Sequence, residues 1–343
     1  MELREALGHV VAGRDLSREQ AEAVMTHIMN GEASPAQLGA LLAALHLKGE
    51  SVDEIAGFAS VLRRFAVPVR LRFDAIDTCG TGGDGSGTFN ISTVSAIVCA
   101  ATGVRVAKHG NRAASSACGS ADVLEALGVR IDLDADGVVR CVEEVGVGFM
   151  FAPRFHPAMR HAAPVRRELG IRTVFNVLGP LANPAGVRRQ LLGVATPRLG
   201  ERIAQVLRAL GSRRVLVAHG EDGLDEISPS GPSRIHELRD GRIEEYVLRP
   251  EDVGLRPARR EEILGGDPQR NREIAERVLA GEDGGPRTAV LLNAGAALYL
   301  ADAAPSIREG AARAAESIDS GRAREILALL VERSRAYAPA DES

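Results

Sequence analysis

One stretch decides the fold of this chain: residues 79–93 read CGTGGDGSGTFNIST. It follows a short apolar segment, Phe73 to Ile76, and leads into a helical pattern from Val94 to Ala101. Glycines let the backbone turn tightly and bring bare N–H groups against a ligand. The helix that follows adds unpaired donors and the positive end of a dipole. Strand, glycine loop and helix N-terminus together predict an anion-binding cradle, suited to phosphate.

This cradle differs from the common nucleotide motifs. No Lys-Ser or Lys-Thr pair closes the glycines, as a P-loop requires. Gly80, Gly82 and Gly85 fit the loose G-x-G-x-x-G pattern, but Asp84 inside the turn would repel a pyrophosphate unless a cation or hydroxyl lay between them. The alternative is a glycine-rich surface turn without a ligand, although such turns seldom carry polar residues as dense as those of 88–93.

Composition excludes several classes of protein. The net charge of -4 gives no basic field for DNA or membrane binding, and the absence of Trp, with only 3 Tyr, argues against stacking on single strands. The 4 cysteines have neither zinc nor disulfide spacing, which indicates reduced thiols. No signal peptide or apolar run of membrane-spanning length is evident. We therefore expect a cytoplasmic protein that binds neither nucleic acid nor membranes.

The first part of the chain has a helical pattern. Three capping-box pairs open it: Ser17 with Gln20, Ser34 with Gln37, and Ser51 with Glu54. Gly31 and Gly49 stand where helices should end. This pattern predicts a small helical bundle, whose wide apolar faces suggest packing against another domain or subunit.

From about Phe73 the pattern changes to short apolar strands that alternate with helices. The strand candidates after it are 104–108, 147–151, 190–195, 215–218 and 289–292. A helix capped by Ser120 and stopped at Gly128 lies between two of them, and residues 234–248 predict a hairpin with an Asp-Gly turn. The alternation predicts an α/β fold with a mostly parallel sheet covered by helices on both faces.

Two more polar clusters follow predicted strands, and ligands of open parallel sheets lie at the carboxyl ends of strands. Residues 108–116, KHGNRAASS, combine cations, an amide and hydroxyls, as a phosphate and carboxylate site does. Residues 219–226, HGEDGLDE, offer the Asp225-Glu226 pair to a hard divalent cation. The alternatives are solvated loop charges in both cases.

No acid–base or nucleophilic constellation stands out. The sequence favours catalysis by positioning and electrostatics, with Lys108 and Asp84 as the charged groups. Arg160 and Arg167, near the end of the helical run 155–168, are interpreted as dipole compensation.

Taken in order, the clusters resemble the anthranilate phosphoribosyltransferase family. The matching strings are CGTGGDGSGTFNIST (79–93), KHGNRAASS (108–116), GSADVLEALG (119–128), FAPRFHPAMRHAAPVRRELGIRTVFNVLGPLANPA (151–185) and GEDGLDEIS (220–228). With the helical N-terminus, the resemblance covers nearly the whole chain. The sequence departs slightly from the family pattern at Ala113-Ala114 and Ala117-Cys118, which bears on ligand affinity rather than identity.

The resemblance implies a nucleoside phosphorylase-like architecture. A helical domain, 1–66, onto which helices from about 155–185 pack, would face an α/β domain, 73–337, across a cleft. A homodimer would form through the helical part. The implied reaction transfers phosphoribose from 5-phosphoribosyl-1-diphosphate to the anthranilate amine and releases pyrophosphate, with two Mg²⁺ ions per monomer.

The resemblance also assigns residues. Those implied to bind phosphoribosyl diphosphate are Gly80, Gly83, Asp84, Thr88, Asn90, Ile91, Ser92, Thr93, Lys108, His109, Gly110, Asn111, Arg112, Ala113, Ala114, Ser115, Ser116 and Ser120. Those implied to hold anthranilate are Gly80, Asn111 and Arg166. Ser92 would bind one metal ion, and Asp225 with Glu226 the second.

Two other functions remain open. A pyrimidine nucleoside phosphorylase would share the architecture and bind phosphate in the same cradle, but phosphorolysis needs no pyrophosphate–metal site. A non-catalytic nucleic-acid-binding paralogue would be expected to carry a basic groove, which this acidic chain lacks.

Overall fold

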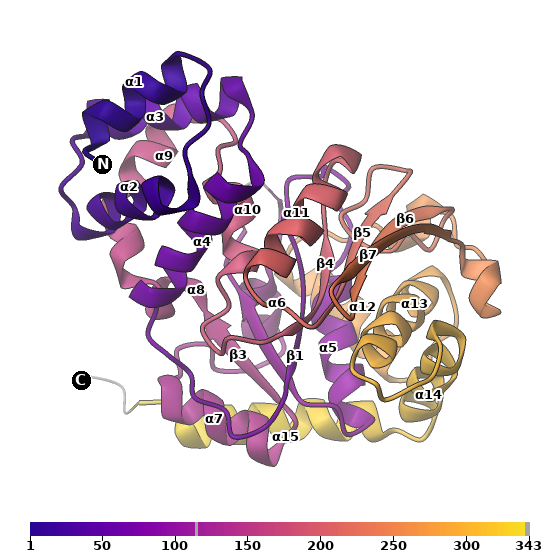
Figure 1. Cartoon of the computed structure of the whole chain (residues 1–343). Coiled ribbons are helices and arrows are strands. Elements are labelled where there is room, and N and C mark those ends of the chain that lie inside the picture. The colour runs from indigo at the N-terminus through magenta and orange to yellow at the C-terminus, as the bar shows by residue number, and fades with distance from the viewer. Residues whose placement is uncertain (114–115, 340–343) are drawn as a thin grey trace.

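The computed structural model of the chain describes residues 1–113 and 116–339, which form a helical bundle beside a sheet flanked by helices (Figure 1). The seven-stranded sheet has the order β3-β2-β1-β4-β5-β6-β7. Its strands are β1 (Ile76–Gly80), β2 (Val106–Gly110), β3 (Val147–Phe151), β4 (Arg189–Gly193), β5 (Arg214–Gly220), β6 (Ser233–Arg239) and β7 (Arg242–Leu248). Strands β1 to β5 are parallel, whereas β6 and β7 form the predicted antiparallel hairpin. The mostly parallel α/β fold is confirmed.

The N-terminal bundle consists of α1 (Leu3–Val11), α2 (Arg18–Asn30), α3 (Pro35–Lys48) and α4 (Val52–Phe65). All three predicted capping boxes are present: the Ser17, Ser34 and Ser51 hydroxyls each accept a hydrogen bond from the backbone N–H three residues on. Gly31 ends α2 in the left-handed region, at φ 79°, which glycine adopts without a steric cost. Local sequence therefore accounts for the ends of these helices.

A later segment of the chain returns to this bundle. It contains α8 (Ala152–Phe155), the 3₁₀ helix η1 (Pro157–His161), α9 (Ala163–Leu169) and α10 (Phe175–Leu181). Helix η1 packs on α2, α9 on α3, and α10 on α4. Figure 1 shows α9 among the N-terminal helices, although more than a hundred residues separate it from α2 in the sequence.

The remaining helices cover the sheet. They are α5 (Ile91–Ala101), α6 (Ser120–Ala126), α7 (Ala135–Glu144), α11 (Pro197–Ala209), η2 (Pro250–Val253), η3 (Arg260–Ile263), α12 (Pro268–Leu279), α13 (Gly285–Leu300), α14 (Ile307–Asp319) and α15 (Arg322–Tyr337). Neighbouring strand residues point alternately to two cores. Leu191 and Leu216 join the core under α5 and α13, whereas Leu192 and Val217 join the core shared with α11 and the bundle.

Three local predictions are wrong. Residues 289–292 belong to α13, a helix buried on nearly every side, whose apolar run lacks the alternation that distinguishes strands from helices. The first strand begins at Ile76 and extends to Gly80, so it includes the first glycine of the loop instead of covering Phe73 to Ile76. Ser120 is the first residue of α6; its N-cap is Gly119, whose N–H donates to the Asp122 carboxylate.

Among the helices of residues 1–113 and 116–339, none is long and apolar enough to cross a membrane.

Candidate active site

The three polar clusters meet in one cleft at the carboxyl ends of β1, β2 and β5. Gly80 at the end of β1 is level with Gly193 of β4, which is level with Ala218 of β5, so the loops that follow lie along one edge. They enclose a cleft of about 330 Å³. Its lining includes Gly80, Gly83, Asp84, Thr88, Asn90, Ile91, Ser92, Thr93, Lys108, His109, Gly110, Asn111, Arg112, Ala113, Ser116, Ser120, Asp225 and Glu226. Ala114 and Ser115 lie outside the described residues.

The glycine loop is held at both of its ends. The Asp84 carboxylate accepts a hydrogen bond from the Ser86 N–H at 3.1 Å, which closes a turn inside the loop. Downstream, the Phe89 N–H donates to the Ile263 carbonyl at 3.1 Å, and the Gly265 N–H donates to the Gly87 carbonyl at 2.8 Å. Residues 263–265, at the end of η3 and just after it, therefore fix the second half of the glycine loop. The sequence did not indicate this contact.

Helix α5 begins at the cleft, and its first turn supplies Ile91, Ser92 and Thr93 to the lining. The preceding residue, Asn90, makes no side-chain capping bond. Its amide donates to the Cys118 carbonyl at 3.1 Å and accepts from Asn271 at 2.9 Å. Asn90 thus ties the glycine loop to the loop after β2 and to α12.

Two carboxylates, Asp225 and Glu226, meet the glycine loop, which carries a third, Asp84. The Gly82 N–H donates to Asp225 at 2.6 Å, the Asp225 N–H donates to Asp84 at 3.2 Å, and the Ser92 N–H donates to Glu226 at 3.2 Å. A Cβ atom at Gly80 would overlap the Asp225 carboxylate. This close approach explains why glycine stands at the end of β1, and it brings the acidic pair to the predicted phosphate cradle.

These carboxylates have different proton affinities. Burial, and then the charges of Glu226 and Asp84, raise the pKa of Asp225 well above its ordinary value. Burial raises the pKa of Glu226 to about 7, although Lys108 and the Ser92 N–H act in the opposite direction. Burial alone would also raise the pKa of Asp84, but hydrogen bonds from Ser86 and Asp225 lower it. Burial therefore favours the protonated forms of Asp225 and Glu226.

The donor set fits a hard divalent cation. Asp225 keeps some surface exposed to the cleft. Glu226 accepts a hydrogen bond from the Ser92 N–H, and the Lys108 ammonium donates to the Ser92 hydroxyl at 3.4 Å. Carboxylate and hydroxyl oxygens suit Mg²⁺, which commonly takes one or two carboxylates and completes its shell with water and phosphate oxygens. The described residues contain no group of three or more His, Cys, Asp or Glu side chains placed to hold a metal alone. A metal here would complete its coordination with water or with oxygens of a bound ligand.

Lys108 is a buried cation at the floor of the cleft. It is 3% exposed, and its ammonium also donates to the Thr78 carbonyl. Its positive charge opposes the raised pKa values of Asp77 and Glu226. The positive charge of Lys108 thus acts on two buried carboxylates, Asp77 in β1 and Glu226 in the loop after β5.

The end of β2 and the loop that follows it provide both charged and neutral groups. The Arg112 guanidinium pairs with Asp122 and Glu125. His109 lies 5.0 Å from His156 between ring centres. Burial, and then the proximity of His156, lower the pKa of His109 to about 3, and burial lowers the pKa of His156 to about 4. At neutral pH both rings are uncharged, and His109 presents a neutral ring to the cleft.

Arg166 is not among the described residues that line this cleft. It lies on α9, partly buried, with its guanidinium 5.0 Å from the centre of the Phe175 ring, and burial lowers its pKa. Arg160 and Arg167 are exposed.

Arg172 and Asn176, on a segment to which sequence reasoning gave no diphosphate-binding role, also line the cleft. They lie where the chain passes from α9 into α10, and the Thr173 N–H donates to the Asn176 side chain at 2.9 Å. The quoted string 151–185 contains both, but no strand precedes them and no spacing relates them to the glycine loop. Only the return of this segment to the cleft reveals them.

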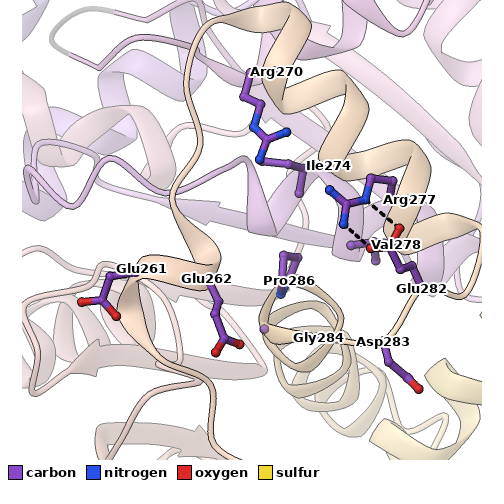
Figure 2. A pocket seen from close by; sticks show the side chains of 11 residues that line it. Glu261, Glu262, Arg270, Ile274, Arg277, Val278, Glu282, Asp283, Gly284 and Pro286 are labelled. Carbon is purple, nitrogen blue, oxygen red and sulfur yellow. Dashed lines mark hydrogen bonds and ion pairs between the residues drawn. The ribbon is translucent and has the colours of Figure 1, made fainter.

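A second hollow of about 330 Å³ lies between η3, α12 and the start of α13 (Figure 2). Its cations are matched by neighbouring carboxylates, since Arg277 pairs with Glu282 and Arg270 with Glu273. The described residues that line it come from neither the glycine loop nor the ends of the parallel strands. This hollow therefore offers no anion site comparable to the cleft.

Known families match both parts of the chain. The glycosyl transferase family helical bundle domain matches residues 4–66, and the glycosyl transferase family a/b domain matches residues 72–324. Anthranilate phosphoribosyltransferase from Chloroflexus aggregans is 56% identical over 340 residues, covering 98% of this chain and 100% of the relative. That from Anaeromyxobacter sp. (strain K) is 58% identical over 330 residues, covering 96% and 98%.

Solved structures agree with these sequences. Anthranilate phosphoribosyltransferase from Thermus thermophilus superposes with a TM-score of 0.91 at 48% identity, covering 96% of this chain and 99% of that one. The enzyme from Saccharomyces cerevisiae in complex with PRPP and Mg gives 0.90 at 28% identity, covering 97% and 98%. The same yeast enzyme with 4-fluoroanthranilate gives 0.87 at 27% identity, covering 98% and 99%. With near-complete coverage in sequence and structure, the chain belongs to the anthranilate phosphoribosyltransferase family.

Proposed function

We propose that the cleft transfers the phosphoribosyl group of 5-phosphoribosyl-1-diphosphate to the amine of anthranilate and releases pyrophosphate. The observation that carries this proposal is that the glycine loop contacts an acidic pair, Asp225 and Glu226, whose pKa values are raised by burial. An acidic pair beside an anion cradle is unfavourable by itself. It becomes favourable when a diphosphate and its cation bind together.

The diphosphate lies against the glycine loop and the first turn of α5. We assign this side of the site to Gly83, Asp84, Thr88, Asn90, Ile91 and Thr93, and the other side to residues 108–113, Ser116 and Ser120. Backbone N–H groups and the helix dipole stabilise the phosphate charge. Lys108 and Asp84 act through their charges and not as acid or base.

Mg²⁺ fits the donors of this cleft, and the yeast relative of similar fold is described with PRPP and Mg. We assign Ser92 to one ion and the Asp225–Glu226 pair to a second, two per monomer. When bound, the metal supplies positive charge to the departing pyrophosphate. The part of this chain is to direct the carboxylates at the cleft, where a bound cation would favour their ionised forms.

Anthranilate lies beside Gly80 and Asn111, with its carboxylate directed to Arg166. The guanidinium is a planar donor suited to a carboxylate, and its stacking on Phe175 limits its motion. The neutral rings of His109 and His156 tolerate an uncharged aromatic amine nearby. The amine attacks C1 of the ribose as pyrophosphate leaves, and it loses its proton late, so no strong base is required.

We also propose how the chain divides into two domains and forms a dimer. Residues 1–66, joined by helices from about 155–185, form one domain, and 73–337 form the other, with the cleft between them. Leu47, 86% exposed, and Val11, 70% exposed, place apolar surface on the bundle. We assign this surface to a homodimer. A cytoplasmic location stays a prediction.

The test follows anthranilate fluorescence in the presence of phosphoribosyl diphosphate and Mg²⁺. Fluorescence should fall as the amine is substituted, and it should not fall without Mg²⁺. A parallel incubation with thymidine and inorganic phosphate should yield no thymine. Phosphorolysis of thymidine with unchanged anthranilate would instead favour a pyrimidine nucleoside phosphorylase.

A further inference from the structure

We propose that Arg172 is a further substrate-binding residue, which holds the glycine loop from across the cleft and donates to the pyrophosphate portion of the substrate. This inference rests on the proposed function, since it names the substrate of that same site. Arg172 lies between α9 and α10, on the segment that packs against the N-terminal bundle. The glycine loop belongs to the sheet.

Arg172 differs from the other cations of the cleft in the pairing of its charge. The cations that line the described part of the cleft are Lys108, Arg112 and Arg172. Arg112 is paired with two carboxylates, and the charge of Lys108 opposes the buried carboxylate of Glu226. Within residues 1–113 and 116–339, no carboxylate lies at ion-pair distance from Arg172. Its charge is therefore the one most available to an anion.

The Arg172 side chain is also positioned at the phosphate loop. Arg172 Nη1 donates to the Gly82 carbonyl at 2.9 Å, so the guanidinium is already fixed on the phosphate loop. Its other N–H groups remain, because guanidinium carries five donors in a planar fork. The bond from the Thr173 N–H to Asn176 holds the turn that carries Arg172. The guanidinium is thus fixed at one edge while its remaining donors can reach phosphate oxygens.

Gly83, next to the Gly82 contact, leaves room for the Arg172 guanidinium. Gly83 has φ 75°, and a Cβ atom there would overlap the Arg172 guanidinium. Gly85, two residues on, has φ 68° and nothing within 4 Å of a built Cβ. Both positions favour glycine for their backbone conformation, but only Gly83 also leaves room for Arg172. This pair of glycines gives a matched control for the contact.

The experiment measures the binding of magnesium pyrophosphate by calorimetry and the two Michaelis constants. Arg172→Gln removes the charge but keeps a neutral donor, whereas Arg172→Lys keeps the charge. We expect Arg172→Gln to weaken pyrophosphate binding roughly 10- to 100-fold, as for loss of a charged hydrogen bond. It should raise KM for phosphoribosyl diphosphate by a similar factor and change that for anthranilate little. Arg172→Lys should restore most of the affinity.

A purely structural bond to Gly82 predicts a different result, in which Arg172→Gln binds pyrophosphate as the wild type does, and this would overturn the proposal. Equal weakening by Gln and Lys would also overturn it. Gly83→Ala should reproduce the loss seen in Arg172→Gln, and Gly85→Ala, with the same backbone strain, should lose much less. Equal losses in the two alanine variants would attribute the effect to strain and refute the contact.

Failure of the proposed function is a separate result. A wild-type protein that binds magnesium pyrophosphate but leaves anthranilate unchanged would reject the transfer reaction while the binding comparison among Arg172 variants still stands. A wild-type protein that transfers phosphoribose, with Arg172→Gln unaffected, would reject only the role of Arg172.

Discussion

Glu226→Gln should stabilise the metal-free protein at high pH and not at low pH. Burial raises the pKa of Glu226 from its ordinary 4.5 to about 7, so the folded state favours the protonated form. Its contribution to stability is fully present below pH 4.5 and is lost as the pH rises through 7. A shift of this size corresponds to about 3 kcal/mol. Gln keeps the oxygen that accepts from the Ser92 N–H but cannot ionise.

The assay is thermal unfolding of both proteins, without metal, at pH 4.5 and pH 8. With an unfolding entropy of about 2 cal/mol/K per residue, 3 kcal/mol corresponds to a melting-temperature difference of about 4 °C for a chain of this length. The difference between Glu226→Gln and wild type should therefore grow by about 4 °C from pH 4.5 to pH 8. Taking the difference cancels the titrating groups that do not interact with Glu226.

Mg²⁺ gives the second arm of this test. At pH 8 it should raise the melting temperature of the wild type, since a ligand that binds only the folded state stabilises it, and it should act more weakly on Glu226→Gln. Glu221→Gln is the matched control, because the Glu221 side chain in the same loop is 48% exposed. A melting-temperature difference for Glu226→Gln that is the same at both pH values would refute the burial argument.

Three other predictions follow from named contacts. Arg166→Ala should raise KM for anthranilate far more than KM for phosphoribosyl diphosphate, and Arg167→Ala, at an exposed position, should change neither; equal changes in both constants would remove Arg166 from this role. Leu47→Glu, which adds charge to the exposed bundle surface, should convert a dimer to a monomer in light scattering, whereas a wild-type monomer at micromolar concentration would contradict the dimer. Gly80→Ala should lower kcat by roughly 10-fold or more, because the added Cβ displaces Asp225, and wild-type turnover in this variant would show that the close approach is unnecessary.

Local signals predicted much of the fold because they depend on near neighbours. The three capping boxes place the N-terminal helices, and the turn of Asp240 and Gly241 places the hairpin of β6 and β7. The positions of the polar clusters after β1, β2 and β5 predicted that they meet, since parallel strands bring their carboxyl ends to one edge. Residue type and strand position were sufficient for this part of the site.

The features that the sequence did not predict depend on packing between segments that are far apart in the chain. The run 289–292 gave no periodicity because α13 is covered on nearly all sides, so a buried helix resembled a strand. Arg172 reaches Gly82 only because the α9–α10 segment folds back, across 90 residues of sequence. The raised pKa of Glu226 likewise comes from burial, which no local pattern reports.

The central claim is that one cleft couples loss of pyrophosphate to substitution of an aromatic amine. Phosphorus NMR of the wild-type protein with phosphoribosyl diphosphate and Mg²⁺ tests it most directly, with and without anthranilate. We expect one pyrophosphate and one new phosphate monoester for each anthranilate consumed, and no pyrophosphate when anthranilate is omitted. Pyrophosphate released at the same rate without anthranilate, or an unchanged spectrum with both substrates present, would contradict it.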